Sequence, residues 1–555
     1  MFSDIEQVNQ LTSLLMAYGV RHAVVCPGSR NAPIVHNLAE CGAITCHSVT
    51  DERSAGFYAI GISEQTSQPV VVCVTSGSAL LNVAPAVAEA YYRHIPLIVV
   101  SADRPMQWID QNDGQTMRQS SALAAVVRRH VNLPMPTDDE TRWYCNRLIC
   151  EALIDCMRHG GGPVHINVPI NEPLFGFSTP SLPRCRVIQH HTSDAADPSC
   201  SVFAERFRRA RCPMIVVGQL PYAVASDPRF RDAIRQLRRC AVVVQERLAD
   251  VEGSDSAFAD AIIDRVAAYK ELAPDWLLYL GGTLVGKKLR HYLRSCQPET
   301  SIRVSASGTV CDTFMHLSDV IESSPVTFLQ SLAVSLTPCS ATESVAVWHH
   351  LLAQAASSIS SIRLRYSQSA AVQCLHTWCE GQKRKATYFY ANSMSVRLGN
   401  YFSSQYLHVN RGVNGIEGSL STAAGYSLTA TDKLVVCVIG DLSFFYDQNA
   451  LWNQALSSNL RILLLNNGGG VIFRQLPGLE QSPVRNSLVS AAHVTTAEGI
   501  CRQNHVDYQI VRDETRLAEG IEWLTAEASS PRLLEVLTDA EVDQEQWKRV
   551  LINLK

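Results

Sequence analysis

Two polar side chains in the last third of the chain have the types and positions expected of ligands to a divalent cation. Asp441 ends one apolar run, and Asn467 ends another about one strand–helix–strand unit later, with three glycines behind it. Mg²⁺ prefers oxygen ligands and usually binds together with a substrate phosphate. Asp441 offers a carboxylate, Asn467 an amide oxygen and Gly469 a backbone carbonyl, so we predict that they hold Mg²⁺ or Mn²⁺. The alternative is a pair of tight turns, where Gly-Asp and Asn-Gly are common.

The segment around these residues is typical of one strand–helix–strand crossover. Leu434–Ile439 and Ile462–Leu465 are apolar enough for buried parallel strands, and a helical pattern from about Phe444 to Leu456 lies between them. Both polar residues therefore fall at carboxyl ends of strands, where open α/β sheets bind ligands.

The same alternation of apolar strand, polar loop and helix recurs along the whole chain. It predicts an α/β fold of three doubly wound domains with mostly parallel sheets. Polar, strand-poor connections near 179–201 and 335–385 suggest domains at 1–180, 200–340 and 380–555. The other predicted strands are Ala23–Cys26, Val70–Thr75, Leu97–Ser101, Val164–Val168, Met214–Val217, Ala241–Gln245, Trp276–Leu280, Ile302–Ser305, Thr387–Ala391, Tyr406–Val409, Tyr508–Val511 and Leu533–Val536.

Composition excludes several classes of protein. The chain has 555 residues, 46% of them hydrophobic and 18% charged, and a formal net charge of −4. This balance argues against a disordered chain and against general binding to nucleic acid or to a membrane surface. The sequence shows no secretory signal and no apolar run long enough to cross a membrane, and its 18 cysteines form no C-x-x-C pair. We therefore expect a cytoplasmic protein with buried, reduced cysteines.

The Gly-Asp pair, a gap in the mid-twenties and the Asn-Asn pair together resemble the signature of thiamine diphosphate enzymes. The resemblance implies thiamine diphosphate as cofactor, with its diphosphate held through the metal ion on Asp441, Asn467 and Gly469. It implies a pyrimidine-binding domain at 1–180 and a diphosphate-binding domain at 380–555. In this family the two domains face each other across a subunit interface, which implies a homodimer or homotetramer. The residues placed beside the diphosphate are Gly440, Leu442 and Ser443.

Such a cofactor is activated by one carboxyl group that hydrogen-bonds to its aminopyrimidine ring, and this requires a Glu in an apolar setting. Glu52 matches the family's activating acid, because it lies in the motif Asp51-Glu52-Arg53 ahead of a helix that begins with small residues. The alternative is a carboxylate that only favours the helix dipole.

Five cations follow predicted strand ends. Arg binds carboxylates in bidentate fashion, so five such residues suggest substrates with several carboxylates. Each one alone could instead be a surface charge or part of a structural ion pair. The five are Arg30, Arg104, Lys287, Arg397 and Arg411.

Several motifs in order resemble the 2-succinyl-5-enolpyruvyl-6-hydroxy-3-cyclohexene-1-carboxylate synthase family of menaquinone biosynthesis. They are PGSR from Pro27, DER from Asp51, ADRP from Ala102, NSMSVR from Asn392, NRGVNGIEG from Asn410 and GDLS from Gly440. The resemblance spans nearly the whole chain. It implies a transferase that decarboxylates 2-oxoglutarate and adds the remaining four-carbon unit to isochorismate in 1,4 fashion. The alternatives are another carboligase or decarboxylase of acetolactate synthase type and a non-catalytic partner protein of the same fold.

The resemblance also assigns roles to single residues. Glu52, Gln115 and Arg397 are catalytic, and Gln115 lies near the aminopyrimidine. Ile416 holds the cofactor in its bent form, and Ser393 lies beside the cofactor and the substrate.

Two substrate sites follow from the same resemblance. The side chains for 2-oxoglutarate are Ser393, Arg397 and Arg411, and those for isochorismate are Ser29, Arg30, Arg104 and Lys287. An apolar wall over the thiazolium ring, for which buried packing is the alternative, consists of Ile472, Phe473 and Leu476.

Overall fold

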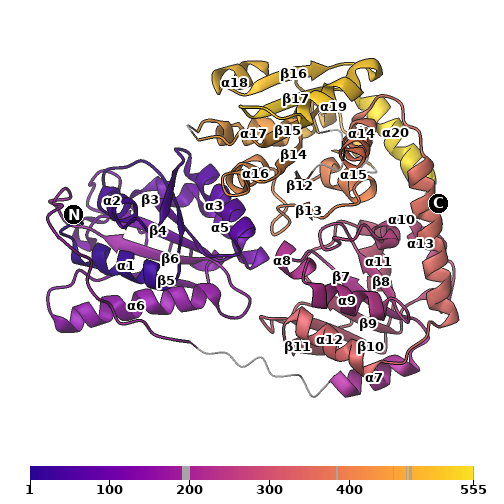
Figure 1. The fold of residues 1–555 in the computed structure, drawn as a ribbon, viewed down its shortest axis with the longest axis horizontal. Coiled ribbons are helices and arrows are strands. Elements are labelled where there is room, and N and C mark those ends of the chain that lie inside the picture. The colour runs from indigo at the N-terminus through magenta and orange to yellow at the C-terminus, as the bar shows by residue number, and fades with distance from the viewer. Residues whose placement is uncertain (191–199, 383–384, 454, 471, 474–477, 554–555) are drawn as a thin grey trace.

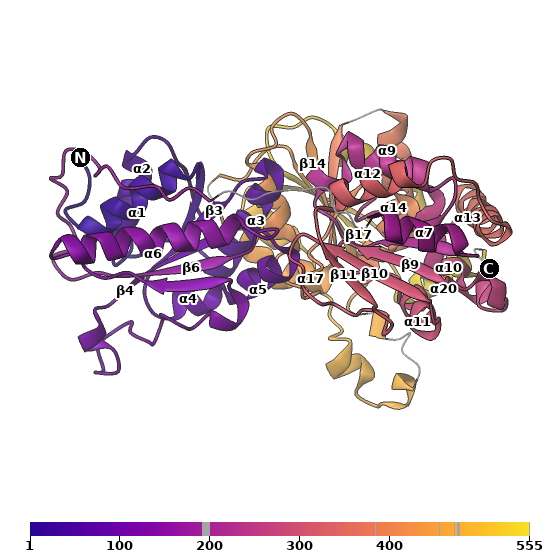
Figure 2. The same ribbon diagram turned by 90° about the horizontal axis from the view of Figure 1, so that it is seen from below.

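The computed structural model describes residues 1–190, 200–382, 385–453, 455–470, 472–473 and 478–553 (Figure 1). Its named strands form three sheets in which every strand pairing is parallel, and helices alternate with the strands, so the predicted α/β class is confirmed. The N-terminal unit lies at one end of the molecule in both views (Figures 1 and 2). No helix in the described ranges is long and apolar enough to span a bilayer.

The N-terminal unit has a six-stranded sheet of order β2-β1-β3-β4-β6-β5. Its central strands are buried along their whole length, as expected of Val- and Ile-rich strands covered by helices on both faces. The strands are β1 (His22–Val25), β2 (Thr45–Ser48), β3 (Val70–Val74), β4 (Leu97–Asp103), β5 (Arg129–Asn132) and β6 (Val164–Pro169). The helices are α1 (Glu6–Ala17), α2 (Ala32–Glu40), α3 (Glu52–Thr66), α4 (Ser78–Asn82), α5 (Ala84–Arg93) and α6 (Asp139–Met157).

The middle unit has a five-stranded sheet of order β11-β10-β9-β7-β8. The strands are β7 (Pro213–Val217), β8 (Val242–Gln245), β9 (Trp276–Leu280), β10 (Thr300–Ser305) and β11 (Asp319–Glu322). The helices are α7 (Cys200–Arg209), α8 (Tyr222–Ala225), α9 (Pro228–Leu237), α10 (Ala259–Val266), α11 (Lys287–Ser295) and α12 (Pro325–Ser335). The long helix α13 (Glu343–Ser361) then runs along the outside of the molecule toward the last unit (Figure 1).

The C-terminal unit has a six-stranded sheet of order β13-β12-β14-β15-β17-β16. The strands are β12 (Ala386–Tyr390), β13 (Leu407–His408), β14 (Leu434–Gly440), β15 (Leu460–Asn466), β16 (Asp507–Val511) and β17 (Arg532–Leu537). The helices are α14 (Gln368–Gly381), α15 (Met394–Phe402), α16 (Ser419–Ser427), α17 (Asp441–Tyr446), α18 (Glu498–Gln503), α19 (Leu517–Thr525) and α20 (Ala540–Asn553).

The predicted helix from about Phe444 to Leu456 is wrong. The helix α17 begins directly at Asp441 and ends at Tyr446, and a short 3₁₀ segment, Gln448–Leu451, follows. The chain turns at Asp447, whose buried carboxylate accepts hydrogen bonds from the backbone N–H and hydroxyl of Ser421 in α16. These bonds hold Asp447 against a neighbouring helix, and the α-helix stops there.

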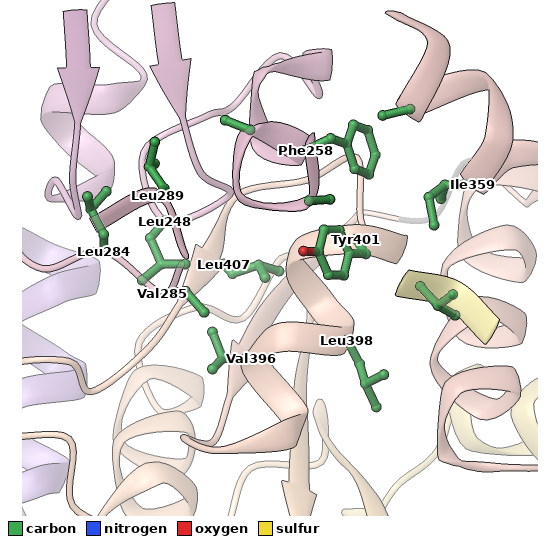
Figure 3. Close-up of a cluster of buried hydrophobic side chains, with 14 of the residues drawn as sticks. Leu248, Phe258, Leu284, Val285, Leu289, Ile359, Val396, Leu398, Tyr401 and Leu407 are labelled. Atoms are coloured by element: carbon green, nitrogen blue, oxygen red, sulfur yellow. The ribbon is translucent and has the colours of Figure 1, made fainter. Parts of the chain in front are cut away.

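Shared apolar cores join the three units. The helix α3 packs against α16 so closely that a Cβ on Gly61 would lie 2.1 Å from the carbonyl oxygen of Thr422. A second core joins the middle and C-terminal units, and Figure 3 shows Leu248 and Val285 of the middle unit beside Leu407 and Val396 of the C-terminal unit. This core fixes the loop ahead of α11 against α15.

Candidate active site

Asp441 meets the backbone that follows β15 at the carboxyl edge of the C-terminal sheet. The strands β14 and β15 are neighbours, with Gly440 opposite Leu465, so the residues after each strand lie together. One carboxylate oxygen of Asp441 accepts hydrogen bonds from the backbone N–H of Asn467 at 3.2 Å and of Gly469 at 2.9 Å. Burial raises the pKa of Asp441, although these hydrogen bonds oppose the shift. The structure thus brings together the three residues predicted as metal ligands.

The side-chain amide of Asn467 has a fixed orientation. Its Nδ2 donates to Oδ2 of Asp543 at 2.7 Å, which leaves Oδ1 as the atom that can face a cation. Within the part of the chain that the structure describes, no group of three or more His, Cys, Asp or Glu residues could hold a metal ion. A cation here would therefore depend on one carboxylate with amide and backbone oxygens. Such a donor set fits Mg²⁺, which binds hard oxygen ligands.

The predicted diphosphate neighbours lie directly around Asp441. Gly440 precedes the first residue of α17, the backbone N–H of Leu442 donates to Asp441 at 2.7 Å, and Ser443 is buried. Of the predicted apolar wall, Ile472 and Phe473 are half-buried, and Leu476 lies outside the described residues.

Glu52 is the first residue of α3, behind the capping residue Asp51. Its carboxylate accepts a hydrogen bond from Nδ2 of Asn82 in α4 at 3.1 Å and remains partly exposed. The described residues of one chain therefore bury Glu52 only partly. The next residue, Arg53, contacts the ring and carbonyl of Tyr446 at the far end of α17 from Asp441.

Gln115 lies in the loop after β4, on the same side of the N-terminal unit. It is exposed and adopts a left-handed backbone conformation with φ of 55°. A Cβ on Gly77, just ahead of α4, would lie 3.4 Å from the backbone of Gln115, so the loop rests on the start of α4. The buried side chain of Gln119 fixes this loop by accepting from Gly77 and donating to Ala102. Glu52 and Gln115 thus both flank α4.

Two of the five cations share one carboxylate at the edge of the N-terminal sheet. Arg30 is buried and donates to the carbonyl of Ile170 at 3.0 Å and to Glu172 at 3.2 Å. Arg104 approaches the same oxygen of Glu172 at 3.5 Å. Ser29 is exposed beside Arg30. A carboxylate therefore already fits between the two guanidinium groups, which is the chemistry expected of a substrate carboxylate.

Two of the other three cations, Arg397 and Arg411, lie where the middle and C-terminal units meet. Arg411 donates to Oδ1 of Asn392 at 3.2 Å and to the carbonyl of Leu284 at 3.1 Å, in the loop that leads to Lys287. Arg397 donates to the carbonyl of Ser393 at 2.9 Å. Lys287 is exposed at the start of α11, three residues after Leu284.

Burial shapes the electrostatics of this second group. It lowers the pKa of both Arg397 and Arg411. The nearby carboxyl groups of Asp260 and Glu246 oppose the shift at Arg397, and that of Glu246 opposes it at Arg411. Two desolvated guanidinium groups beside each other form a strongly attractive site for an anion.

Comparison with known proteins decides the family. Residues 6–123 match the model for the thiamine pyrophosphate enzyme, N-terminal TPP binding domain. A 2-succinyl-5-enolpyruvyl-6-hydroxy-3-cyclohexene-1-carboxylate synthase of Phocaeicola vulgatus is 42% identical over 98% of this chain and 97% of its own length. The synthases of the same name from Bacteroides thetaiotaomicron and Desulfotalea psychrophila are 41% and 36% identical, over 100% and 88% of this chain and 100% and 90% of their own lengths. The chain belongs to this synthase family.

Sequence reasoning missed four residues at the candidate site of this synthase-family chain. Asp543 orients Asn467, His493 places Nε2 3.4 Å from Asp441, and Glu172 joins Arg30 to Arg104. Glu246, buried in the middle unit, accepts hydrogen bonds from the backbone ahead of Lys287. No motif or spacing marks these residues, because each reaches its partner from a distant part of the chain.

Proposed function

We propose that this chain is a thiamine diphosphate-dependent transferase that joins 2-oxoglutarate to isochorismate with release of CO₂ and so forms 2-succinyl-5-enolpyruvyl-6-hydroxy-3-cyclohexene-1-carboxylate for menaquinone biosynthesis. The observation that carries the proposal is its similarity, over almost its full length, to synthases named for this product. The gathering of cations at strand ends supports it, because these substrates carry several carboxylates between them. We place the reaction in the cytoplasm.

The C-terminal unit holds the charged end of the cofactor in this proposal. Asp441, the amide oxygen of Asn467 and the carbonyl of Gly469 bind Mg²⁺ or Mn²⁺, with Gly440, Leu442 and Ser443 beside the diphosphate. The fixed amide of Asn467 supports this assignment, because its NH₂ group is already bonded to Asp543. We propose 1–180, 200–340 and 380–555 as the limits of the three domains.

Glu52 is the acid that activates the cofactor in this proposal. Its carboxyl group would hydrogen-bond to the aminopyrimidine of the cofactor, Gln115 would lie near the same ring, and Ile416 and Ile472 would support the cofactor. Bound thiamine diphosphate supplies a nucleophilic carbon and an electron sink for decarboxylation of the 2-oxo acid. Arg397, Ser393 and Arg411 orient 2-oxoglutarate.

The residues for the second substrate come from two units. Arg30 and Arg104 hold carboxylate groups of isochorismate at the place that Glu172 occupies in the structure, with Ser29 beside them. Lys287 provides a further charge from the middle unit. Ile472, Phe473 and Leu476 form the apolar wall that excludes water from the reacting carbon.

The site is completed in an oligomer, as a homodimer or homotetramer. Supporting this, several large apolar side chains are exposed in the segments that follow strands of the N- and C-terminal sheets, and grouped exposed apolar side chains are typical of protein interfaces. They include Met106, Trp108, Ile416, Tyr446, Trp452 and Leu488.

Product analysis tests the proposal. Purified protein is incubated with thiamine diphosphate, Mg²⁺, 2-oxoglutarate and enzymatically made isochorismate, and the adduct is detected by mass spectrometry. We expect the adduct only when both substrates are present. Consumption of pyruvate without any reaction of 2-oxoglutarate would contradict the substrate assignment.

A further inference from the structure

The loop that carries Arg411, residues 409–418 (the Arg411 loop), rests on a buried carboxylate of the N-terminal unit. Glu89 of α5 is 1% exposed, and its two oxygens accept hydrogen bonds from successive backbone N–H groups. Oε1 accepts from Gly412 at 2.8 Å and Oε2 from Val413 at 2.9 Å. Burying a carboxylate is costly unless it is paired. Both carboxylate oxygens of Glu89 accept hydrogen bonds from one short stretch of the C-terminal unit.

Arg93, one helical turn after Glu89, holds the other side of the same loop. Its Nη1 donates to Oδ1 of Asn410 at 3.2 Å, while Glu89 binds the residues after Arg411. Arg411 therefore lies between two points that are fixed to α5. Arg93 is itself paired with Glu64 of α3, and although burial alone would raise the pKa of Glu64, Arg93 and His408 lower it to about 2.

The loop is in direct contact with α5, with no room for a side chain at its contact point. A Cβ on Gly412 would lie 2.7 Å from the carbonyl oxygen of Glu89 and 3.0 Å from its Oε2. A larger residue would therefore push the loop away from the helix and break both hydrogen bonds.

A shift of this backbone would move the Arg411 side chain. The carbonyl of Arg411 accepts a hydrogen bond from the hydroxyl of Thr283, and its guanidinium group donates to Asn392 and Leu284. These partners come from two units and fix the guanidinium direction only while the loop keeps its place on α5.

We infer that Glu89, assisted by Arg93, is a positioning residue that fixes Arg411 for binding of the 2-oxoglutarate carboxylate. The inference rests on the proposed function and deepens it, since it assigns a role in the C-terminal substrate site to a helix of the N-terminal unit. Glu89 acts through the backbone of Gly412 and Val413.

Hydrogen exchange of the whole protein tests the contact itself. In Glu89→Gln one backbone N–H faces an amide NH₂ group, which cannot accept its hydrogen bond. We therefore expect faster hydrogen exchange of the backbone amides at 412–413 than in the wild type. Asp275→Asn is the matched control, because Asp275 likewise accepts from two successive N–H groups, those of Arg211 and Cys212, in the middle unit. Faster exchange in the control should be confined to 211–212. Unchanged exchange at 412–413 in Glu89→Gln would overturn the inference.

Steady-state kinetics test the consequence. For Glu89→Gln we expect the KM for 2-oxoglutarate to rise about tenfold with kcat changed by less than about threefold, the effect of weakening one charge-assisted contact in both ground and transition states. The KM for isochorismate and all constants of Asp275→Asn should stay near wild type. A fall in kcat with an unchanged KM for 2-oxoglutarate would overturn the inference.

Gly412→Ala disturbs the same contact from the side of the loop, so it should also raise the KM for 2-oxoglutarate. It tests the inference even where Glu89→Gln does not fold. Wild-type protein without carboligation would contradict the proposed function. An active wild type with normal KM in both variants would contradict this inference alone.

Discussion

A structural role and a catalytic role of Glu52 require different properties of its side chain. As the first residue of α3 it favours the helix dipole whatever its chemistry, and its carboxylate accepts a hydrogen bond from Asn82. Proton transfer, in contrast, requires an ionisable group at this point.

We predict that Glu52→Gln binds thiamine diphosphate almost normally but loses carboligation by about 10²- to 10⁴-fold, the usual contribution of a positioned acid or base. Cofactor titration followed by tryptophan fluorescence and product formation measure the two effects. Glu498→Gln is the matched control, because Glu498 is the exposed first residue of α18. Equal activity losses in both variants, or unchanged turnover in Glu52→Gln, would refute the assigned role.

Glu246 gives a pH dependence that can be measured on the folded protein. Burial raises its pKa from 4.5 to about 7, against the hydrogen bonds from Val285 and Gly286 and the charge of Arg411. The folded state thus holds this proton more tightly than the unfolded state. Its contribution to the free energy of unfolding is fully present below pH 4.5 and is lost as the pH rises through 7.

Thermal unfolding of the wild type and of Glu246→Gln between pH 5 and 8 checks this prediction. This pH range covers most of the titration of Glu246. The stability of the wild type should fall relative to the variant as the pH rises, by on the order of 3 kcal/mol in total. Parallel curves across this range would show that Glu246 does not titrate there.

At the residue scale, contacts between residues that follow adjacent strands of one sheet could be predicted. Contacts between segments that are distant in the sequence could not. Asp441 and Asn467 follow adjacent parallel strands, so their meeting follows from sheet topology. Asp543 reaches Asn467 from α20, and Glu172 reaches Arg30 from the end of β6, without any spacing signal.

At the scale of elements, the packing of α3 on α16 sets the relation between the N- and C-terminal units. Gly61 and Gly425 let the two backbones approach directly, and a Cβ on Gly425 would lie 2.2 Å from the carbonyl oxygen of Tyr58. These glycines lower the helix propensity of α3 and α16 but allow the two helices to pack closely.

Gly61→Ala should therefore lower the free energy of unfolding by about 3 kcal/mol or more, because a rigid backbone oxygen occupies the space of the new methyl group. The midpoint of thermal unfolding measures the change. The control is Gly499→Ala in α18, where a Cβ would meet nothing within 4 Å and alanine should stabilise by up to about 1 kcal/mol. A Gly61→Ala protein as stable as the control would contradict the close packing.

Central strands could be predicted, and so could the edge strands β8, β13 and β16, but three other edge strands could not. The buried strands β3 and β4 are continuous runs of apolar residues. The missed strands β2, β5 and β11 read TCHS, RHVN and DVIE and lie at sheet edges, where one side meets water and the apolar signal fades. The helix after β14 was predicted too long, because periodicity does not show the contact of Asp447 with α16.

At the scale of the whole molecule, the predicted cofactor residues come from different units, because Glu52 begins α3 of the N-terminal unit and Asp441 begins α17 of the C-terminal unit. Glu52 lies at the open edge of the N-terminal unit, and the contact of Arg53 with Tyr446 places it near the far end of α17 from Asp441. Exposed apolar side chains occur in both units, among them Trp108 and Trp452. We therefore expect each cofactor to be held by Glu52 of one subunit and Asp441 of another.

Subunit complementation tests this central claim most directly. Glu52→Gln and Asp441→Ala are each expected to be inactive, the second because it no longer retains cofactor in the presence of Mg²⁺. The two variants are co-expressed with different tags, and hybrid oligomers are isolated by successive affinity steps. A dimeric hybrid would contain one intact site and one doubly altered site, so we predict about half of wild-type carboligation per oligomer. Hybrids as inactive as their parents would contradict a cofactor site shared between subunits.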